Sequence, residues 1–243
     1  MTFEEYKIID EFMLSHMQDS AHDRHHIYRV LNSAVDIHKH EESVDFDVLV
    51  TTCLLHDIGR EQQFKDSDDS CHAETGSKMA YNFLLSIGWD QKKALHVREC
   101  IASHRFRVNK KPQSIEAKIL FDADKLDASG AIGIARTLIY EGQVGESLYY
   151  IDDDGNIIID NDEGDSTSFF QEYNFKLKKV YSKFFTERAK EIAAERQKTA
   201  MSFYDDLYYE ISDNYKNGII NYMDITRSRC PLLLSDSESG GTT

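Results

Sequence analysis

The sequence predicts an all-α protein. Its 243 residues include only two prolines, and the twelve glycines are scattered along the chain instead of marking regular turns. Apolar residues recur every three or four positions through most of the chain, which is the period of a helix with one buried face. Because 41% of the residues are hydrophobic, the chain can form a core, and this combination favours long helices over a sandwich of short strands.

The N-terminal part of the chain is expected to form three helices. Ser20 and Asp23 have the S-x-x-D spacing of a capping box and mark the start of the second one. Gly59 follows the third and is expected to be its C-cap, because glycine commonly ends a helix. The expected helices span about residues 3–17, 20–40 and 45–56.

More helices follow, with one interruption, over about residues 72–86, 90–104, 114–125 and 128–140. Residues 148–159 carry apolar runs on both sides of an Asp-Gly turn and predict a small β-hairpin. A long helical stretch of one or two helices is expected from about 167 to 213. We expect a single domain over 1–213 and a partly disordered C-terminal tail over 214–243.

Charge and composition exclude several classes of partner. The net charge of −15 offers no basic stripe for a phosphate backbone, so no nucleic-acid polymer is expected to bind. No apolar run is long enough to span a membrane, and the acidic N-terminus does not resemble a signal peptide. The expected location is therefore the cytoplasm, where the four cysteines, which lack C-x-x-C spacing, stay reduced. The oligomeric state is left open, with a homodimer as one option.

A set of histidines and aspartates indicates a metal centre. His56 and Asp57 stand side by side at the end of an apolar helix and offer a nitrogen and an oxygen ligand. His26 lies upstream and Asp124 downstream, both on expected helices. Mixed histidine and carboxylate ligands suit Mn, Fe, Co, Ni or Zn, and Mg is also available in the cell. Such an ion lowers the pKa of bound water and polarises a phosphoryl oxygen, so the pattern suggests a hydrolase.

Around these residues the chain resembles the HD-superfamily phosphohydrolases over roughly residues 20–210. The resemblance is closest to small bacterial HD proteins similar to nucleoside triphosphate pyrophosphohydrolases. It implies an HD-domain helical bundle, with a metal core at about 22–140, C-terminal helices at about 167–213 and one metal held by His26, His56, Asp57 and Asp124. The matching segments are AHDRHHIYRVLNSA (21–34), LLHDIG (54–59), HAETGSKMA (72–80), ASHRF (102–106), FDADKLDASGAIGIARTL (121–138) and FTERAKEIAAERQKTAMSFYDDL (185–207).

Other polar residues near the motif are candidates for catalysis. Arg60 and Lys125 are expected to bind a substrate phosphate and to offset negative charge that develops during the reaction, and Asp57 takes part as a metal ligand. Glu61 is a candidate general acid or base. Some HD enzymes carry an acid one position earlier, where this chain has Arg60, so the identity of the acid stays open.

Three histidines and two aspartates have roles that the resemblance leaves open. His72 and His104 complete the order of a six-ligand, two-metal HD centre, and they are also candidates for binding substrate phosphate or water. His22 stands one turn before His26 and is a further candidate for the substrate side. Asp122 and Asp127 flank the last ligand and are expected to support other residues or to cap helices.

The expected function is therefore the metal-dependent hydrolysis of a small phosphate ester, with a nucleotide as the leading substrate class. Release of pyrophosphate from a nucleoside triphosphate, release of phosphate from a monophosphate, and cleavage of a cyclic phosphodiester all fit. One alternative is a di-iron HD oxygenase, in which His72 and His104 join the metal centre. Another is a nucleotide-binding HD module without turnover.

Overall fold

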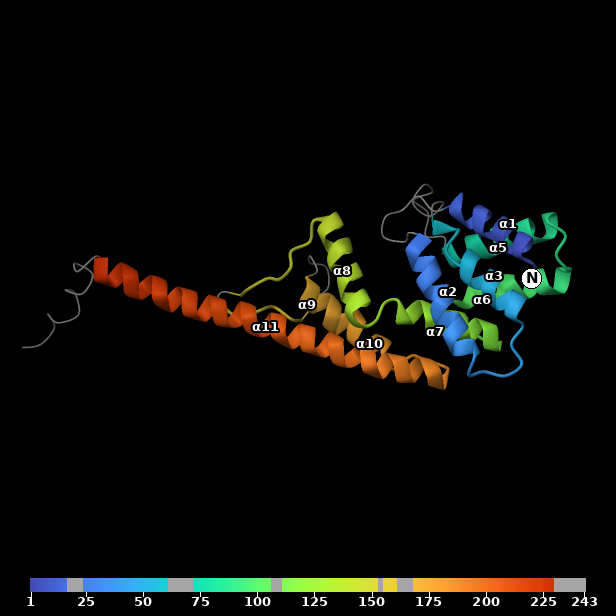
Figure 1. Ribbon diagram of the computed structural model, residues 1–243. Coiled ribbons are helices and arrows are strands. Elements are labelled where there is room, and N and C mark those ends of the chain that lie inside the picture. Colours follow the sequence, from blue (N-terminus) through green and yellow to red (C-terminus); the bar gives the residue numbers. More distant parts are fainter. Residues whose placement is uncertain (17–23, 61–71, 106–110, 153–154, 161–167, 230–243) are drawn as a thin grey trace, which may run out of the picture.

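The computed structural model describes residues 1–16, 24–60, 72–105, 111–152, 155–160 and 168–229. Within these ranges the regular structure is helical, which confirms the all-α prediction (Figure 1). The elements are α1 (Phe3–Leu14), α2 (Arg24–His38), α3 (Phe46–Leu55), α5 (His72–Ser86), α6 (Gln91–Ser103), α7 (Ile115–Leu126), α8 (Gly130–Val144), α9 (Phe169–Glu172), a π-helical turn (Tyr173–Leu177), α10 (Lys178–Val180) and α11 (Glu187–Arg229).

Helix α3 is the centre of the N-terminal bundle. Every residue from Val48 to Leu55 is buried, which explains why this stretch of the sequence is almost uniformly apolar. α3 packs against α1, α2, α6 and α7, and two apolar clusters form around it. His56 and Asp57 follow the last turn of α3. Because α3 lies inside the bundle, both residues are buried in its interior.

The C-terminal part is organised along α11. This helix packs against α7 and α8 and then extends away from the bundle (Figure 1). A third apolar cluster forms where Ala200, Tyr204 and Leu207 of α11 meet the aromatic residues of α9. We expected the helical stretch to stop near residue 213, but α11 continues to Arg229, so the C-terminal tail begins later than predicted. Residues 230–243 lie outside the described part of the chain.

The predicted hairpin at 148–159 is reduced to a single antiparallel bridge between Ile151 and Ile157. Backbone hydrogen bonds join Asp152 to Asn156 and Tyr150 to Ile158, and Gly155 adopts the left-handed conformation with φ of 82°. Asp153 and Asp154 lie outside the described residues. The turn therefore forms as the Asp-Gly sequence indicates, but the segment does not become a pair of strands.

The prediction that Gly59 caps α3 is wrong. The helix ends at Leu55 with His56 as its C-cap, and Gly59 has no left-handed φ. A Cβ atom at Gly59 would lie 2.5 Å from the amide nitrogen of Gly76 on α5 and would also meet the backbone of His72. Gly59 is thus needed for close packing of the metal-motif turn on α5. The proposed capping box at Ser20 and Asp23 lies outside the described residues.

No described helix combines the length and the apolar content that crossing a membrane requires.

Candidate metal centre

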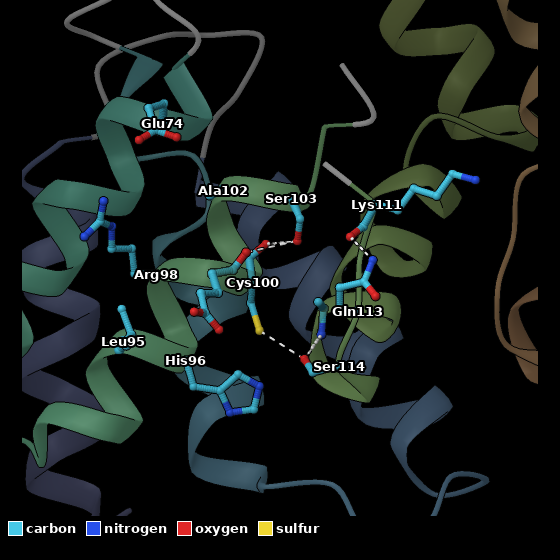
Figure 2. A pocket seen from close by; sticks show the side chains of 12 residues that line it. Glu74, Leu95, His96, Arg98, Cys100, Ala102, Ser103, Lys111, Gln113 and Ser114 are labelled. Carbon is cyan, nitrogen blue, oxygen red and sulfur yellow. Dashed lines mark hydrogen bonds between the residues drawn. The ribbon is translucent and has the colours of Figure 1, made fainter. Parts of the chain in front are cut away.

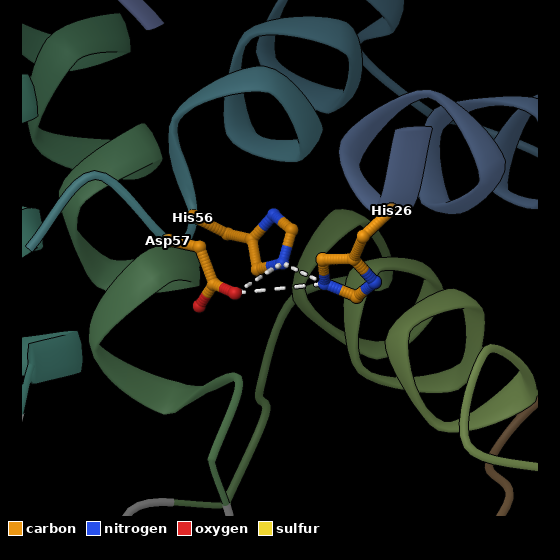
Figure 3. A group of neighbouring side chains, drawn as sticks. All are labelled: His26, His56 and Asp57. Carbon is orange, nitrogen blue, oxygen red and sulfur yellow. Dashed lines mark hydrogen bonds and ion pairs between the residues drawn. The ribbon is translucent and has the colours of Figure 1, made fainter. Parts of the chain in front are cut away.

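Helices distant in sequence bring the expected ligands together. His26 comes from the first turn of α2, His56 and Asp57 follow α3, and Asp124 lies in the last turn of α7. His26 Nε2 lies 3.3 Å from His56 Nε2 and 3.5 Å from Asp57 Oδ2 (Figure 3). Asp124 Oδ1 lies 3.6 Å from His26 Nε2. The ligand atoms of His26, His56 and Asp57 are buried and lie close enough together to share one cation.

In His26 and His56, the ring nitrogen that faces away from the other ligands is bound to a hydrogen-bond acceptor. His56 Nδ1 donates to the carbonyl oxygen of Cys53 at 2.8 Å, and His26 Nδ1 donates to Asp127 Oδ2 at 2.7 Å. A proton on Nδ1 leaves the lone pair of neutral imidazole on Nε2. Both rings are therefore oriented to present Nε2 as a ligand atom, and this arrangement is common for metal-binding histidines.

Asp57 faces a second group of histidines with its other oxygen. Asp57 Oδ1 lies 3.5 Å from His72 Nε2 and 3.6 Å from His104 Nε2. Both groups, His26–His56–Asp57 and Asp57–His72–His104, are buried and have the spacing of a metal site. His104 Nδ1 donates to the carbonyl oxygen of Ile101 at 2.7 Å, so its Nε2 also points inward. The structure thus places all four histidines of the two-metal order within 3.6 Å of Asp57, and Asp124 lies beside His26.

Burial and neighbouring charges shift the pKa values of the titratable groups in the centre. Burial lowers the pKa of His56 to about 4 and outweighs the opposing charge of Asp57. Burial acts in the same direction on His26, but its hydrogen bonds to Asp127 and Asp57 outweigh it and raise its pKa to about 8. Burial would raise the pKa of Asp57, yet the charges of His56 and Arg60 hold it well below its ordinary value. Asp57 is therefore an anion in the interior, and the Arg60 guanidinium is a cation that contacts it.

The two cations proposed for phosphate binding lie at the edge of the centre. Arg60 Nε donates to Asp57 Oδ2 at 2.6 Å, and Lys125 Nζ donates to Asp124 Oδ2 at 2.9 Å. Both side chains are partly exposed, at 21% and 23%. They contact expected metal ligands directly, which the sequence did not indicate. Glu61 and His22 lie outside the described residues.

Asp122 and Asp127 have different roles. Both are buried acids, and they flank Asp124 in the sequence. Asp127 holds His26 and also accepts hydrogen bonds from Arg29 and Arg136. Asp122 instead accepts from the backbone amides of Phe185 and Thr186, just before α11 begins. Asp127 is thus both a supporting partner of His26 and the C-cap of α7, whereas Asp122 lies within α7 and binds the residues before α11.

Sequence reasoning missed three arginines near the centre. Arg29 and Arg136 contact Asp127, and Arg105 contacts His72, with its Nη1 3.1 Å from His72 Nδ1. Their position in the sequence carried a weak signal. Arg29 is one helical turn after His26, and Arg105 directly follows His104. Arg136 lies on α8 and is brought in only by the fold.

A cavity of about 680 Å³ lies between α6 and the start of α7 (Figure 2). Its lining includes His96, Arg98, Cys100 and Ser114, and the Cys100 thiol lies 3.5 Å from the Ser114 hydroxyl. None of the expected metal ligands lines it. The cavity therefore does not identify where a substrate of the metal centre binds.

Comparison with known proteins places this geometry in a family. The family model described as "HD domain" matches residues 24–129. The chain is 31% identical over 198 residues to the uncharacterized protein YpgQ of Bacillus subtilis, a match that covers 80% of this chain and 86% of YpgQ. The chain belongs to the HD-domain superfamily.

Solved structures agree with this assignment. Bacillus subtilis YpgQ in complex with ADP superposes with a TM-score of 0.65 at 29% identity and covers 85% of this chain and 97% of YpgQ. A "predicted HD superfamily hydrolase" from an uncultured Thermotogales bacterium superposes with a TM-score of 0.56 at 28% identity, and the match covers 86% of this chain and 92% of that one. Both matches include most of the relative, so the shared fold extends beyond the metal motif.

Proposed function

We propose that this protein is a metal-dependent phosphohydrolase that acts on a small phosphate ester, with a nucleotide as its substrate class. The observation that carries the proposal is the buried group formed by His26, His56 and Asp57, with Asp124 Oδ1 3.6 Å from His26 Nε2. The carbonyl oxygen of Cys53 accepts a hydrogen bond from His56, and the carboxylate of Asp127 accepts one from His26. Both bonds are made at Nδ1, so Nε2 of each ring faces the other ligands.

The donor set fits a divalent ion. Asp57 Oδ1 and His104 Nε2 are buried and have no hydrogen-bond partner among the described residues. Buried polar atoms are rarely left in this state, because the lost hydration is not replaced. Nitrogen and carboxylate ligands together favour Mn, Fe, Co, Ni or Zn over an ion that prefers oxygen alone, and Mg stays a candidate. Manganese is our leading choice for a first test.

The residues of the chain divide the work of hydrolysis between them. A bound ion supplies Lewis acidity and a water of lowered pKa. Asp127 keeps His26 in the orientation that a ligand requires, and Asp57 supplies negative charge at the centre. Arg60 contacts Asp57 through Nε, and its guanidinium carries further N–H donors on the two terminal nitrogens for a phosphate. Lys125 adds a second cation on the α7 side, where it can offset charge on the leaving group.

A nucleotide substrate is supported by the relative that was solved with ADP. Three reactions share one chemistry, because in each of them water attacks phosphorus. They are pyrophosphate release, phosphate release and cleavage of a cyclic phosphodiester. The general acid or base stays a proposal, with Glu61 as the candidate. His22 stays a proposed residue of the substrate side.

The experiment is product analysis on a panel of nucleoside mono-, di- and triphosphates and cyclic nucleotides, with Mn, Mg, Co and Ni supplied in turn. We expect turnover of at least one nucleotide, and we expect His56→Ala and Asp57→Ala to abolish it while the protein stays folded by circular dichroism. Turnover at the wild-type level in either variant would exclude the metal assignment. Binding of ADP without turnover of any nucleotide would support a non-catalytic binding module instead.

One observation favours a second candidate, a di-iron HD oxygenase. Asp57 presents Oδ1 to His72 and His104, so a second ion could share this carboxylate. Iron analysis together with oxygen consumption distinguishes the two functions. An oxygenase would hold two irons and consume oxygen, whereas the proposed phosphohydrolase would release phosphate or pyrophosphate without oxygen.

A further inference from the structure

The chain turns from α7 into α8 directly after the expected metal ligand Asp124. Asp124 lies in the last turn of α7, Asp127 is the C-cap of that helix, and α8 begins at Gly130. We call residues 127–130 the α7–α8 corner. Asp127, its first residue, is also the acceptor of the hydrogen bond from His26 Nδ1. The position of the corner therefore affects both an expected ligand and the group that orients another one.

A cation from a distant helix binds the end of α7 at this corner. Arg196 of α11 donates through Nη1 to the carbonyl oxygen of Leu126, the last residue of α7. The amide and the hydroxyl of Ser129 donate to the same oxygen at 3.1 Å and 2.7 Å. Carbonyl groups in the last turn of a helix lack partners within the helix and carry partial negative charge, so a cation is favourable there. Arg196 thus fastens the end of α7 to α11 across 70 positions of the sequence.

The corner is also packed and hydrogen-bonded on its other sides. A Cβ atom at Gly130 would lie only 2.8 Å from the Cβ atom of Arg196, so the corner touches the stem of the same arginine. The Gly130 amide donates to the hydroxyl oxygen of Tyr181, which follows α10, at 2.9 Å. Arg136 of α8 donates to the carboxylate and to the carbonyl oxygen of Asp127. Contacts from three separate parts of the chain therefore fix where residues 127–130 lie.

We propose that Arg196 and Tyr181 are positioning residues of the metal centre, which hold the α7–α8 corner and thereby place Asp124 and Asp127. The proposal rests on the metal-dependent function proposed above. Both residues act through the backbone of the corner. They lie beyond residues 24–129, the part of the chain that the HD domain model matches, so the proposal gives the C-terminal helices a role in the centre.

The test is the affinity of the full chain for Mn²⁺, measured by calorimetric titration. Arg196→Gln removes the cation at the end of α7 and should weaken Mn²⁺ binding roughly ten- to a hundredfold, as the loss of groups that orient metal ligands does. Arg196→Lys keeps a cationic donor on a long side chain and should retain affinity within about threefold of the wild type. Rescue by lysine would show that the charged contact is what matters.

Tyr181→Phe is a second variant that removes a single oxygen atom. Its loss leaves the Gly130 amide without this acceptor and should weaken Mn²⁺ binding roughly three- to tenfold, the size of one hydrogen bond. Electron paramagnetic resonance of bound Mn²⁺ gives an independent readout. The spectrum should change shape in Arg196→Gln and in Tyr181→Phe, because the ligands around the ion are displaced.

Two controls separate positioning from a general loss of stability. Asp122→Asn disturbs another connection of α7, the one to the backbone of Phe185 and Thr186, and should leave Mn²⁺ affinity and the Mn²⁺ spectrum nearly unchanged. Arg188→Gln makes the same substitution as Arg196→Gln on the same helix, at a side chain that donates to Asp36 of α2 at 2.9 Å. It should also leave Mn²⁺ binding unchanged.

The failures are distinguishable. Unchanged Mn²⁺ affinity in a folded Arg196→Gln would overturn the proposal, and so would an equal loss of affinity in Asp122→Asn. If Arg196→Gln does not fold, Tyr181→Phe decides, and unchanged affinity together with an unchanged spectrum would overturn the proposal. A wild type that binds no divalent ion would instead overturn the proposed metal-dependent function.

Discussion

The contact between His26 and Asp127 shows that Asp127 and Asp122 have different roles, which the sequence did not distinguish. Asp122 is buried on α7 and Asp127 is the buried C-cap of that helix, but only Asp127 reaches a ligand of the proposed ion. Asp122 receives four hydrogen bonds from Phe185 and Thr186 and so joins α7 to the start of α11. One acid serves the metal centre, and the other serves the connection between elements.

This difference gives a matched pair of variants. Asp127→Asn should weaken divalent-metal affinity roughly ten- to a hundredfold, because the acceptor that orients His26 loses its charge. Asp122→Asn should keep metal affinity within about threefold and lower the free energy of unfolding by about 1–3 kcal/mol, because one of its two buried acceptor oxygens becomes an NH2 group that faces other donors. Calorimetric metal titration and chemical unfolding of both variants measure the two quantities. Equal metal affinities in the two variants would contradict the role of Asp127.

Glu141 is a buried acid far from the metal centre. Its side chain on α8 is 5% exposed, and neither carboxylate oxygen has a hydrogen-bond partner among the described residues. Burial, followed by the charges of Glu172 and Glu146, raises its pKa from 4.5 to about 7. A carboxyl group with a raised pKa binds its proton more tightly in the folded state. Its contribution to stability is therefore present below pH 4.5 and is lost as the pH rises to about 7.

Glu141→Gln tests this sign. Above pH 7 the variant should be more stable than the wild type by about 1–3 kcal/mol, because it buries no charge. Near pH 5 the advantage should largely vanish, since the wild-type carboxyl is then protonated in the folded state. Unfolding curves at pH 5 and pH 8 measure the change, and Glu195→Gln, at a side chain 74% exposed on α11, should differ from the wild type by no more than about 0.5 kcal/mol at either pH. A lower stability of Glu141→Gln at pH 8 would reverse the interpretation.

At the scale of elements, the metal motif depends on how closely two helices approach. The turn after α3 carries His56 and Asp57, and Gly59 ends it against Gly76 of α5. His72 is the first residue of α5, so the same contact sets the distance between the two histidine groups. The packing of α5 on the motif turn therefore belongs to the geometry of the site.

Gly59→Ala should disturb that packing. A Cβ atom would meet the backbone of α5, and overpacking of this kind costs about 1–3 kcal/mol. We expect a lower melting temperature and weaker metal binding together. Gly142→Ala is the control, because a Cβ atom there meets nothing within 4 Å on exposed α8, and it should stabilise the helix by about 0.5–1 kcal/mol. Opposite signs for the same substitution would confirm the packing argument, and a neutral Gly59→Ala would contradict it.

At the scale of the whole molecule, α11 extends beyond the part that packs. Its contacts include the aromatic cluster around Tyr204, Leu207 and Ile211, and Tyr215 lies against Gly155. Residues 216–218 and 221–225 are exposed. The metal centre lies in the bundle formed by α1 to α7. Helix α8 stands between this bundle and the C-terminal end of α11 (Figure 1).

A truncation series tests this division. Ending the chain after Asn217 should leave the metal count unchanged and shift the melting temperature by less than about 4 °C, because little buried surface is removed. Ending it after Ala200 removes three residues packed on the aromatic cluster and should lower the melting temperature much further. Calorimetry and elemental analysis of the two chains measure the outcome. Loss of metal in the shorter deletion would show that the end of α11 supports the centre.

The sequence by itself determined the helices and the set of metal-ligand candidates. Helical periodicity is local, so elements such as 72–86 and 90–104 were predicted almost to their observed ends. The His26, His56, Asp57 and Asp124 set came from motif order and from resemblance to a family. The structure groups the first three and places Asp124 next to His26.

The tertiary structure decided which partner each of these residues has. Asp127 and not Asp122 holds His26, Arg105 faces His72, and Gly59 packs on α5 instead of capping α3. These contacts join residues separated by 101, 33 and 17 positions, so no local pattern encodes them. The end of α11 also differs from the prediction, because the helix continues from residue 213 to Arg229 as a mostly exposed stretch. The physical reason is the same in each case, because burial, distance and charge are properties of the packed chain.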